Sequence, residues 1–352
     1  MKHIKQNFTF LRCIVRILFI LQIIVGFTCK DKGTEPLYNL NPYLKEIKFL
    51  DPKKTGIFHM AVWRDSTIYA IQQFSRFIID KNYNVQHDTI LLDVGIYEKY
   101  WTYIDADVNG SKILLVASRF RDASSGALYE YDRQTGNIQM IYDRSHNISS
   151  ARYFPNDVMK IVYYSYGDDN FVGAGYYLHD KTTNRDSLLF SYISTAGPTE
   201  MLNGFDIHPN GNSLLIPISH STPLMLKPPK LGKVSLSEQK LDTLNINFSF
   251  SKGRSGLWVR YNKDASKILY CCFPYGAYTA ISNDGSEVGI IESSTMNKRI
   301  IDVNTQSNTK YLSVQLAPNW SPDEKAIIFG SGNVSIEGSL GRRHLYILTK
   351  IE

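Results

Sequence analysis

Residues 317–329 read APNWSPDEKAIIF, and this stretch guides the interpretation of the whole chain. A short run that ends in Trp320 leads into a Pro322-Asp323 turn, and the β-branched apolar run Ile327-Ile328-Phe329 follows. This succession is typical of a strand, a tight turn and a second strand. The stretch therefore predicts a β-hairpin.

Weaker copies of this hairpin recur upstream. In each copy one apolar residue opens the second strand, and these residues are Ile68, Ile113, Ile161, Leu214, Ile268 and Ile327. The gaps between them are 45, 48, 53, 54 and 59 residues. A period somewhat above 40 residues, with several strands in each unit, is typical of the blades of a β-propeller.

Each unit also carries a second pair of strands. Residues 127–132 and 137–142 alternate between apolar and polar types on either side of a glycine turn, and residues 175–179 and 187–190 repeat the pattern. A single four-stranded sheet cannot bury both of its faces, and radial stacking of such sheets solves that problem. We therefore predict an all-β fold, a six-bladed β-propeller of four-stranded blades.

The repeat resembles that of a known family. Residues 320–329 are similar to the W-S-P-D-G-K-x-I-x-F repeat of TolB-type β-propellers, a WD40-like (PD40) repeat, although the glycine after Pro-Asp is mostly replaced in this chain. Residues 278–286 resemble the hairpin between the third and fourth strands of the same family. The resemblance covers nearly all of the chain after the N-terminal segment, and it implies a six-bladed ring.

The ends of the chain predict how the ring closes. The last unit ends on a run at residues 343–350 that is interpreted as its third strand, so the unit lacks a fourth. The run at residues 44–50 precedes the first hairpin and needs a partner. We expect this run to form the outer strand of the last blade, which leaves no orphan edge at the junction.

The fifth unit leaves two alternatives. Its outer strands are formed either by residues 277–291 or by an extra pair at residues 299–303 and 310–314. The pair that is not used would be an inserted hairpin or half of a seventh blade. Six blades are the favoured count.

Residues 1–28 have the pattern of a signal peptide. Four basic residues and no acidic ones accompany an apolar core at residues 14–27, which Thr28 and Cys29 follow. This arrangement resembles a processing site of Bacteroidetes-type lipoproteins and predicts lipidation of Cys29, a tether at residues 29–42 and one propeller domain at residues 43–352. The alternative is an ordinary cleaved signal with a chance cysteine. A lipid would anchor the protein to the outer membrane without spanning it, facing the periplasm or the cell surface.

The charge of the chain argues against a nucleic-acid partner. The formal net charge is +6, but removal of the four basic residues of the signal leaves 35 Lys and Arg against 33 Asp and Glu. The mature protein is therefore nearly neutral and lacks the basic footprint of a nucleic-acid-binding domain.

One column of the repeat carries charge where a strand face is normally apolar. Three residues before the proline-type turn position, the units place Asp105, Arg152, Asp206, Arg260 and Asn319, with His59 as the approximate equivalent in the first unit. One interpretation is a charged rim of the axial channel that binds a peptide or a small polar ligand. The other, favoured, interpretation is a ring of ion pairs that holds neighbouring blades together.

No metal or cofactor motif stands out. His208 has no second histidine at ligand spacing, so a turn-capping or packed histidine is favoured. Asp168 and Asp169 carry the hard oxygen donors that Ca²⁺ prefers, although a solvated hairpin tip is the favoured interpretation. Cys271 and Cys272 are adjacent in a predicted strand and should point to opposite faces as two packed cysteines.

The functional prediction rests on the fold and on missing motifs. The chain has no Gly-x-Ser-x-Gly elbow and no Asp-box repeats. We therefore expect a non-catalytic binding or scaffold protein, monomeric, that recognises an envelope protein, a peptide or another ligand. The alternatives are a polysaccharide-active lyase or hydrolase with its site in the channel, and a small-molecule sensor.

Overall fold

The computed structural model describes residues 41–47, 60–71, 74–91, 100–118, 126–167, 172–192, 204–218, 230–248, 254–275, 287–301, 314–334 and 340–351. Leu40–Glu352 form one compact unit, distinct from Met1–Asn39. The predicted signal peptide, Cys29, His59, Asp168 and Asp169 all lie outside the described residues. Within the described ranges, no helix has the length and apolar character needed to cross a membrane.

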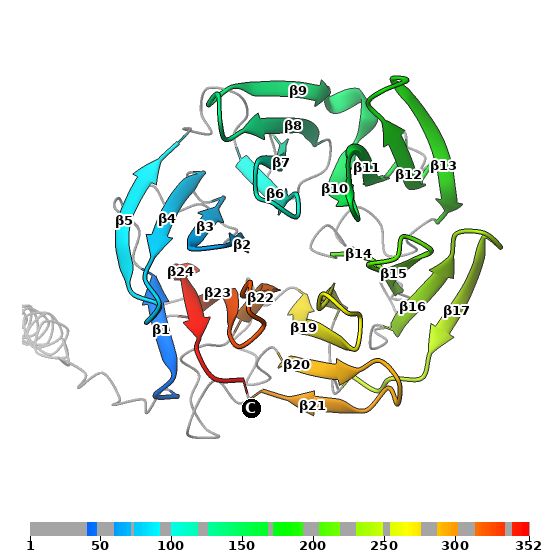
Figure 1. The fold of residues 1–352 in the computed structure, drawn as a ribbon. Helices are drawn as coiled ribbons and strands as arrows, with labels where there is room; N and C mark the ends of the chain where they lie inside the picture. Colours follow the sequence, from blue (N-terminus) through cyan, green and yellow to red (C-terminus); the bar gives the residue numbers. More distant parts are fainter. Residues whose placement is uncertain are drawn as a thin grey trace, which may run out of the picture. The chain divides into compact units, whose positions relative to one another are not determined.

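The strands form six antiparallel sheets of four strands each, arranged around a central axis (Figure 1). In the first five blades the strands follow the sequence order from the inner edge to the outer edge. This arrangement confirms the predicted six-bladed β-propeller.

The first three blades account for residues 61–191. Blade one contains β2 (Ala61–Arg64), β3 (Thr67–Ala70), β4 (Ser75–Ile79) and β5 (Val85–Ile90). Blade two contains β6 (Tyr100–Ala106), β7 (Lys112–Ser118), β8 (Ala127–Asp132) and β9 (Ile138–Tyr142). The 3₁₀ turn η3 (Arg144–His146) then leads to blade three, with β10 (Ile148–Phe154), β11 (Asp157–Ser165), β12 (Gly175–Asp180) and β13 (Arg185–Ser191).

The other three blades use the rest of the chain and its N-terminal strand. Blade four contains β14 (Asp206–Ile207), β15 (Ser213–Ile218), β16 (Lys230–Ser235) and β17 (Lys240–Leu244). Blade five contains β18 (Arg254–Tyr261), β19 (Lys267–Tyr275), β20 (Glu287–Glu292) and β21 (Lys298–Ile300). Blade six contains β22 (Val314–Trp320), β23 (Ile327–Val334), β24 (Leu340–Leu348) and β1 (Leu44–Ile47).

The place of a strand within its blade decides how deeply it is buried. Every residue of β15 is buried, whereas β13, on an outer edge, has only exposed and half-buried residues. Neighbouring blades cover both faces of a middle strand, so it is largely apolar, while an outer strand meets water. The residues predicted to open the second strands are all at most 1% exposed, and they are Ile68, Ile113, Ile161, Leu214, Ile268 and Ile327.

The ring closes between the two ends of the propeller unit. β1 pairs antiparallel with β24, in a register that runs from Leu44 opposite Leu348 to Ile47 opposite Leu345. Ile47 also packs in an apolar cluster with Trp63 of blade one and Ile328 of blade six. The predicted closure by the run at residues 44–50 is therefore confirmed, with the strand described over Leu44–Ile47.

The outer strands of blade five differ from both predicted alternatives. The third strand, β20, comes from the end of the first candidate pair, and the fourth, β21, from the start of the second. The hairpin between the third and fourth strands therefore has its turn at residues 293–297. The predicted hairpin at residues 278–286 falls outside the described residues. Val314 begins β22, the inner strand of blade six, and the described residues form no seventh blade.

Two adjacent cysteines and one buried glutamate contribute to the packing of the blades, and the cysteines lie as the sequence predicted. Cys271 and Cys272 are both buried, and they contribute to different apolar clusters on the two faces of β19. Glu130 of β8 accepts bonds from Lys112 of its own blade at 2.9 Å and from Tyr153 Oη and Lys181 Nζ of blade three at 2.9 and 2.6 Å. Glu130 therefore ties blade two to blade three.

Truncation of the closing strand should destabilise the ring. Ile47→Ala removes a side chain that is 1% exposed, and the loss should be about 2–4 kcal/mol in the free energy of unfolding. Ile300→Ala, on the outer strand β21 where the side chain is 53% exposed, should change it by less than about 0.5 kcal/mol. Urea denaturation of both variants checks this, and equal effects would contradict the role of β1 in closure.

Glu130 should make stability depend on pH. Burial raises the pKa of Glu130, but its bonds with Lys181, Lys112 and Tyr153 lower it more, so the pKa lies below its usual value. The folded state therefore gains stability above the unfolded pKa of about 4.5, and loses it as the pH falls through the folded pKa. Glu130→Gln should cost roughly 2 kcal/mol or more at pH 7. The difference from the wild type should shrink towards pH 3 in denaturation curves, and a difference independent of pH would refute this account.

Candidate functional site: the channel mouth

The turns between the first and second strands explain the repeated sequence. In four blades, the residue after the inner strand makes two backbone hydrogen bonds across the turn. Its N–H donates to the carbonyl five residues later, and its carbonyl accepts from the N–H three residues later. These residues are Asp107, His208, Asn262 and Ser321. A side-chain oxygen adds a further bond, for example from Lys267 N to Asn262 Oδ1 at 2.8 Å and from Ala326 N to Ser321 Oγ at 2.9 Å. Asp, Asn and Ser suit this position because their short side chains bond to nearby backbone groups.

His208 occupies the same turn position in blade four. Its Nδ1 accepts from Asn210 N at 3.3 Å, and its ring packs edge-on against Tyr261 with centroids 5.2 Å apart. The prediction of a turn-capping, packed histidine is confirmed. Across the described residues, no group of three or more His, Cys, Asp or Glu side chains is arranged to hold a metal ion.

The strand register shows which residues form the predicted column. In blades two to six the column residue directly precedes the residue that pairs with the apolar residue predicted to open the second strand; for instance, Arg152 precedes Tyr153, which pairs with Ile161. Asp105, Asp206, Arg260 and Asn319 hold the same place in their blades. In blade one, Trp63 pairs with Ile68, so Val62 holds this place rather than His59.

The inner strand of each blade has one edge without a partner strand, and the polar column bonds to it. Asp105 Oδ2 accepts from Tyr153 N of the next blade at 3.3 Å, and Asp206 Oδ2 accepts from Tyr261 N of the next blade at 2.6 Å. Asn319 Nδ2 donates to the Ala61 carbonyl at 2.6 Å, from blade six to blade one. A buried edge of this kind needs such partners, because unpaired backbone groups are costly to bury.

Arg152 links three blades through two carboxylates. Its guanidinium lies 2.6 Å from Asp206 Oδ1 and 3.4 Å from Asp105 Oδ1. Burial lowers the pKa of Arg152, but the two carboxylates raise it more, and the net effect is a raised pKa. Burial raises the pKa of Asp206, whereas Arg152 and the backbone N–H groups lower it. The effect of burial is the larger one, so the pKa is raised. Arg152 therefore stays charged, while the charged form of Asp206 carries a cost of burial.

Arg260 joins blade five to blades two, four and six without a carboxylate. Its Nε donates to Asn319 Oδ1 at 3.0 Å, and its two terminal nitrogens donate to the Phe205 carbonyl at 3.2 Å and to Tyr103 Oη at 3.0 Å. The guanidinium carbon also lies 5.4 Å from the ring centroid of Trp258, within cation–π range.

Arg64 completes the ring in blade one, and the sequence analysis missed it. It follows the column position by two residues, and its guanidinium donates to the carbonyls of Asp107 and Ala106 in blade two at 2.8 and 2.9 Å. The signal that could have revealed it is the charge at the end of the first hairpin strand, Ala61–Arg64, next to a short turn.

A second pair of residues at the mouth, Lys263 and Glu324, was also missed. Glu324 has a left-handed backbone, φ 60°, at the turn position where the family repeat has glycine. Its carboxylate accepts from Lys263 N at 2.6 Å, and Lys263 Nζ donates to the Pro322 carbonyl at 2.5 Å. Glu324, which replaces the glycine of the family repeat, therefore joins the turns of blades five and six.

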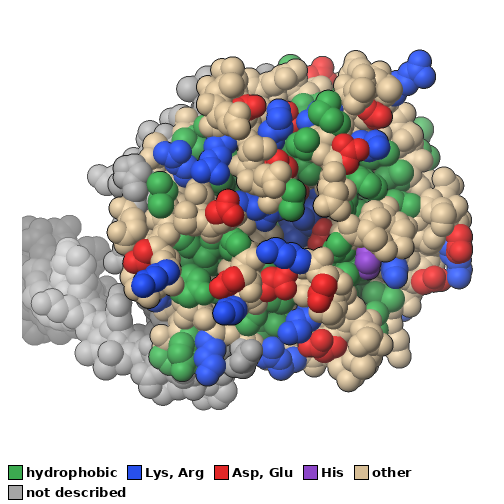
Figure 2. All heavy atoms as spheres, viewed as in Figure 1, with side chains coloured by type: hydrophobic (Ala, Val, Ile, Leu, Met, Phe, Trp, Pro, Cys, Tyr) green, Lys and Arg blue, Asp and Glu red, His purple; other side chains and the backbone are tan. Residues whose placement is uncertain are grey.

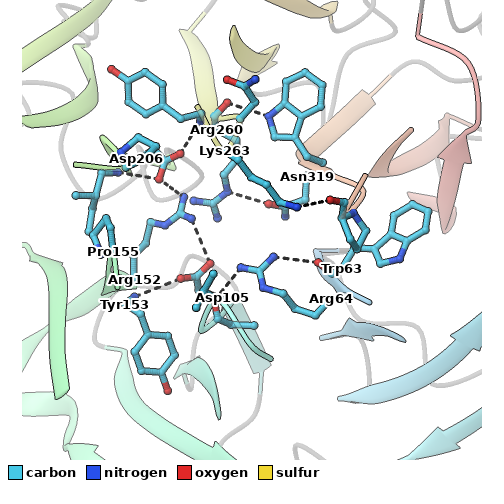
Figure 3. A pocket seen from close by; sticks show the side chains of 18 of the residues that line it. Trp63, Arg64, Asp105, Arg152, Tyr153, Pro155, Asp206, Arg260, Lys263 and Asn319 are labelled. Atoms are coloured by element: carbon cyan, nitrogen blue, oxygen red, sulfur yellow. Dashed lines mark hydrogen bonds and ion pairs between the residues drawn. The ribbon is translucent and has the colours of Figure 1, made fainter. Parts of the chain in front are cut away.

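These groups surround a cavity of about 450 Å³ at the end of the axial channel, and all six blades contribute to its lining. Seen along the axis, the propeller unit is hollowed at its centre, where basic and acidic side chains gather (Figure 2). Asp105, Arg152, Asp206 and Arg260 lie in the depth of the cavity, and Figure 3 shows how they converge. Of the predicted site residues, the structure thus brings together five, while His59 is outside the described residues.

Comparisons with known proteins support nothing beyond the fold. No protein-family model and no curated protein sequence matches the chain. It is similar to the solved structures of a putative TolB from Agrobacterium tumefaciens (12% identity, 83% of this chain and 90% of that one, TM-score 0.49) and of TolB from Acinetobacter baumannii (14%, 82% and 78%, 0.37). It is also similar to oligogalacturonate lyase from Vibrio parahaemolyticus (12%, 82% and 76%, 0.45). At these identities and scores the similarity says nothing about function, and the six sheets themselves establish the propeller.

Gly110 and Ala265 occupy equivalent turn positions in blades two and five, and substitutions at the two positions should change the stability of the fold in opposite directions. Ala265 has φ 59°, so Ala265→Gly should stabilise the fold by about 0.5–1 kcal/mol, because L-residues are strained there. Gly110 has φ 65°, and a Cβ there would lie 2.8 Å from Arg64 Cβ, so Gly110→Ala should destabilise it by about 1–3 kcal/mol. Thermal denaturation measures both, and a shift of the same sign in the two variants would show that the turns are not equivalent.

Proposed function

We propose that this protein is an exported, lipid-anchored binding protein that recognises its ligand at the mouth of the propeller channel. The observation that carries the proposal is the cavity at the mouth, about 450 Å³ and lined by every blade. Its size falls within the range of small-molecule sites, and such sites combine apolar walls with a few fixed polar groups.

The state of the polar groups favours binding over catalysis. Asp206 accepts from Tyr261 N and contacts Arg152, and Asp105 accepts from Tyr153 N while contacting the same guanidinium. Carboxylates engaged in this way are fixed recognition and structural groups, whereas a general base needs a free lone pair aimed at the substrate.

The location follows from the N-terminal sequence. A basic start, an apolar core and Cys29 support export and lipidation, and so an anchor in the outer membrane of a cell envelope. The partner that this location favours is an envelope protein or peptide, bound by a monomeric propeller. A small-molecule sensor would use the same cavity.

A polysaccharide-active enzyme is the second candidate. The observation in its favour is Asp206, a carboxylate in the channel whose pKa burial raises, because carboxylates with raised pKa serve as general acids in glycan cleavage. Purified protein incubated with acidic and neutral polysaccharides tests this candidate. Release of reducing or unsaturated ends that Asp206→Asn abolishes would replace the binding proposal.

A variant at the lip of the cavity tests the binding function without disturbing the polar ring. Val108 lines the cavity and is 69% exposed, so Val108→Lys should leave the fold intact and weaken ligand or partner binding at least tenfold. Val85→Lys, on the outer strand β5 where the side chain is 37% exposed, is the matched control. Capture from detergent-solubilised envelope with the lipidated protein measures the difference, and partners retained equally by both variants would rule out the channel mouth.

A further inference from the structure

The basic groups of the channel mouth are not matched one to one by carboxylates. Arg152 contacts both Asp105 and Asp206, but in the part of the chain that is described neither Arg64 nor Arg260 has a carboxylate oxygen within 4.0 Å. A buried charge normally has an opposite charge beside it, since desolvation of an unpaired ion is costly. Two guanidinium groups at one cavity, that of the buried Arg260 and that of the half-buried Arg64, therefore have no carboxylate in direct contact.

Arg260 retains donors for a ligand. The residue is 2% exposed, yet it lines the cavity, and its described partners are an amide oxygen, a carbonyl and a phenol. A guanidinium carries five N–H donors, and these three bonds use three of them. Two N–H donors of this buried cation therefore have no partner among the described residues.

Burial of Arg64 is only partly offset by the charges around it. Burial lowers its pKa and Arg152 lowers it as well, while Asp105, Asp107 and Asp206 raise it without restoring the usual value. The carboxylate of Asp107 also accepts from Ser111 Oγ at 2.6 Å and from Lys112 N at 3.2 Å. An anion placed in the cavity would offset the remaining cost of burying this cation.

The geometry of the cavity defines the shape of that anion. In Figure 3 the guanidinium groups of Arg64, Arg152 and Arg260 turn toward one region of the channel. The rest of the lining is mixed: it includes the apolar or aromatic residues Trp63, Val108, Phe154, Pro155, Pro209, Trp320 and Pro322 beside the polar residues Asp65, Asn156, Lys263 and Glu324. A planar carboxylate suits the forked donors of arginine, and an apolar or ring-shaped body suits the lip.

We propose that the channel mouth binds a carboxylate group carried on an apolar or ring-shaped body, with Arg64 and Arg260 as its cationic partners. The proposal rests on the binding function proposed above and specifies the chemistry of its ligand. A peptide C-terminus and an acidic sugar both present such a group.

Neutral isosteres separate charge recognition from shape recognition. Calorimetric titration of the full-length lipidated protein in detergent should show saturable binding of N-acetylphenylalanine, and at least tenfold weaker binding of N-acetylphenylalaninamide, in which an amide replaces the carboxylate. Glucuronate, with glucose as its neutral counterpart, is the arm for an acidic sugar. The tighter of the two acids identifies the source of the carboxylate.

Two variants with opposite expected effects keep the test independent of folding damage. Arg64→Gln should weaken the tighter acid at least tenfold, whereas Arg133→Gln, at an exposed position in the turn after β8, should not change it. Asp206→Asn removes a competing negative charge and should strengthen binding about tenfold. A gain of affinity cannot result from a damaged site, so it supports the proposal even if Arg64→Gln fails to fold.

Three results would overturn the carboxylate proposal: acids and neutral isosteres that bind alike, inorganic phosphate that binds as tightly as the better acid, or affinity unchanged in both Arg64→Gln and Asp206→Asn. If any of these occurs while Val108→Lys still loses an envelope partner, the binding function stands and only the ligand class is wrong. If the acids bind as expected and Val108→Lys keeps its partner, the ligand class stands and the partner docks elsewhere.

Discussion

The propeller depends on bonds between side chains of one inner strand and the free backbone edge of the next. An inner strand has a partner strand on one side only, so the N–H and C=O groups of its other edge need other partners. In blade five the backbone of Gly204 bonds to Leu257 and Val259 on this edge. Asp105 and Asp206 accept from two such N–H groups, and Asn319, Arg260 and Arg64 donate to carbonyls of neighbouring blades. The same residues thus satisfy the strand edges and fix the distance between blades, which explains why charge is buried at the axis.

This arrangement links stability to recognition. Because the polar side chains are held by backbone groups, they keep a fixed geometry at the channel mouth, and fixed donors lose little entropy when a ligand binds. The counter-charges are concentrated on Arg152, which leaves Arg64 and Arg260 with neutral partners. A ring built to close the channel therefore also has the charge distribution of a binding site.

In the turns of blades five and six, a residue other than glycine has the strained left-handed backbone. Glu324 and Ala265 occupy left-handed positions that glycine fills at Gly110 and Gly211. Glu324 uses this position to reach Lys263 N and Asn262 Nδ2 in blade five, whereas Ala265 makes no comparable bond. Departures from the family repeat thus have different causes in different blades, and only that of Glu324 has a structural explanation.

The sequence by itself determined the second strand of each blade and the strand that closes the ring, and it favoured six blades over seven, because these features depend on local turns and on runs that must be apolar when both faces are covered. It also predicted five members of the polar column, since their spacing from the turn is constant. It did not place the outer strands of blade five or the first member of the column, where long intervals between runs leave the register open. Arg64, Lys263 and Glu324 were missed for another reason: their partners lie in the next blade, more than 40 residues away for Arg64, and a contact across that distance exists only once the ring has closed.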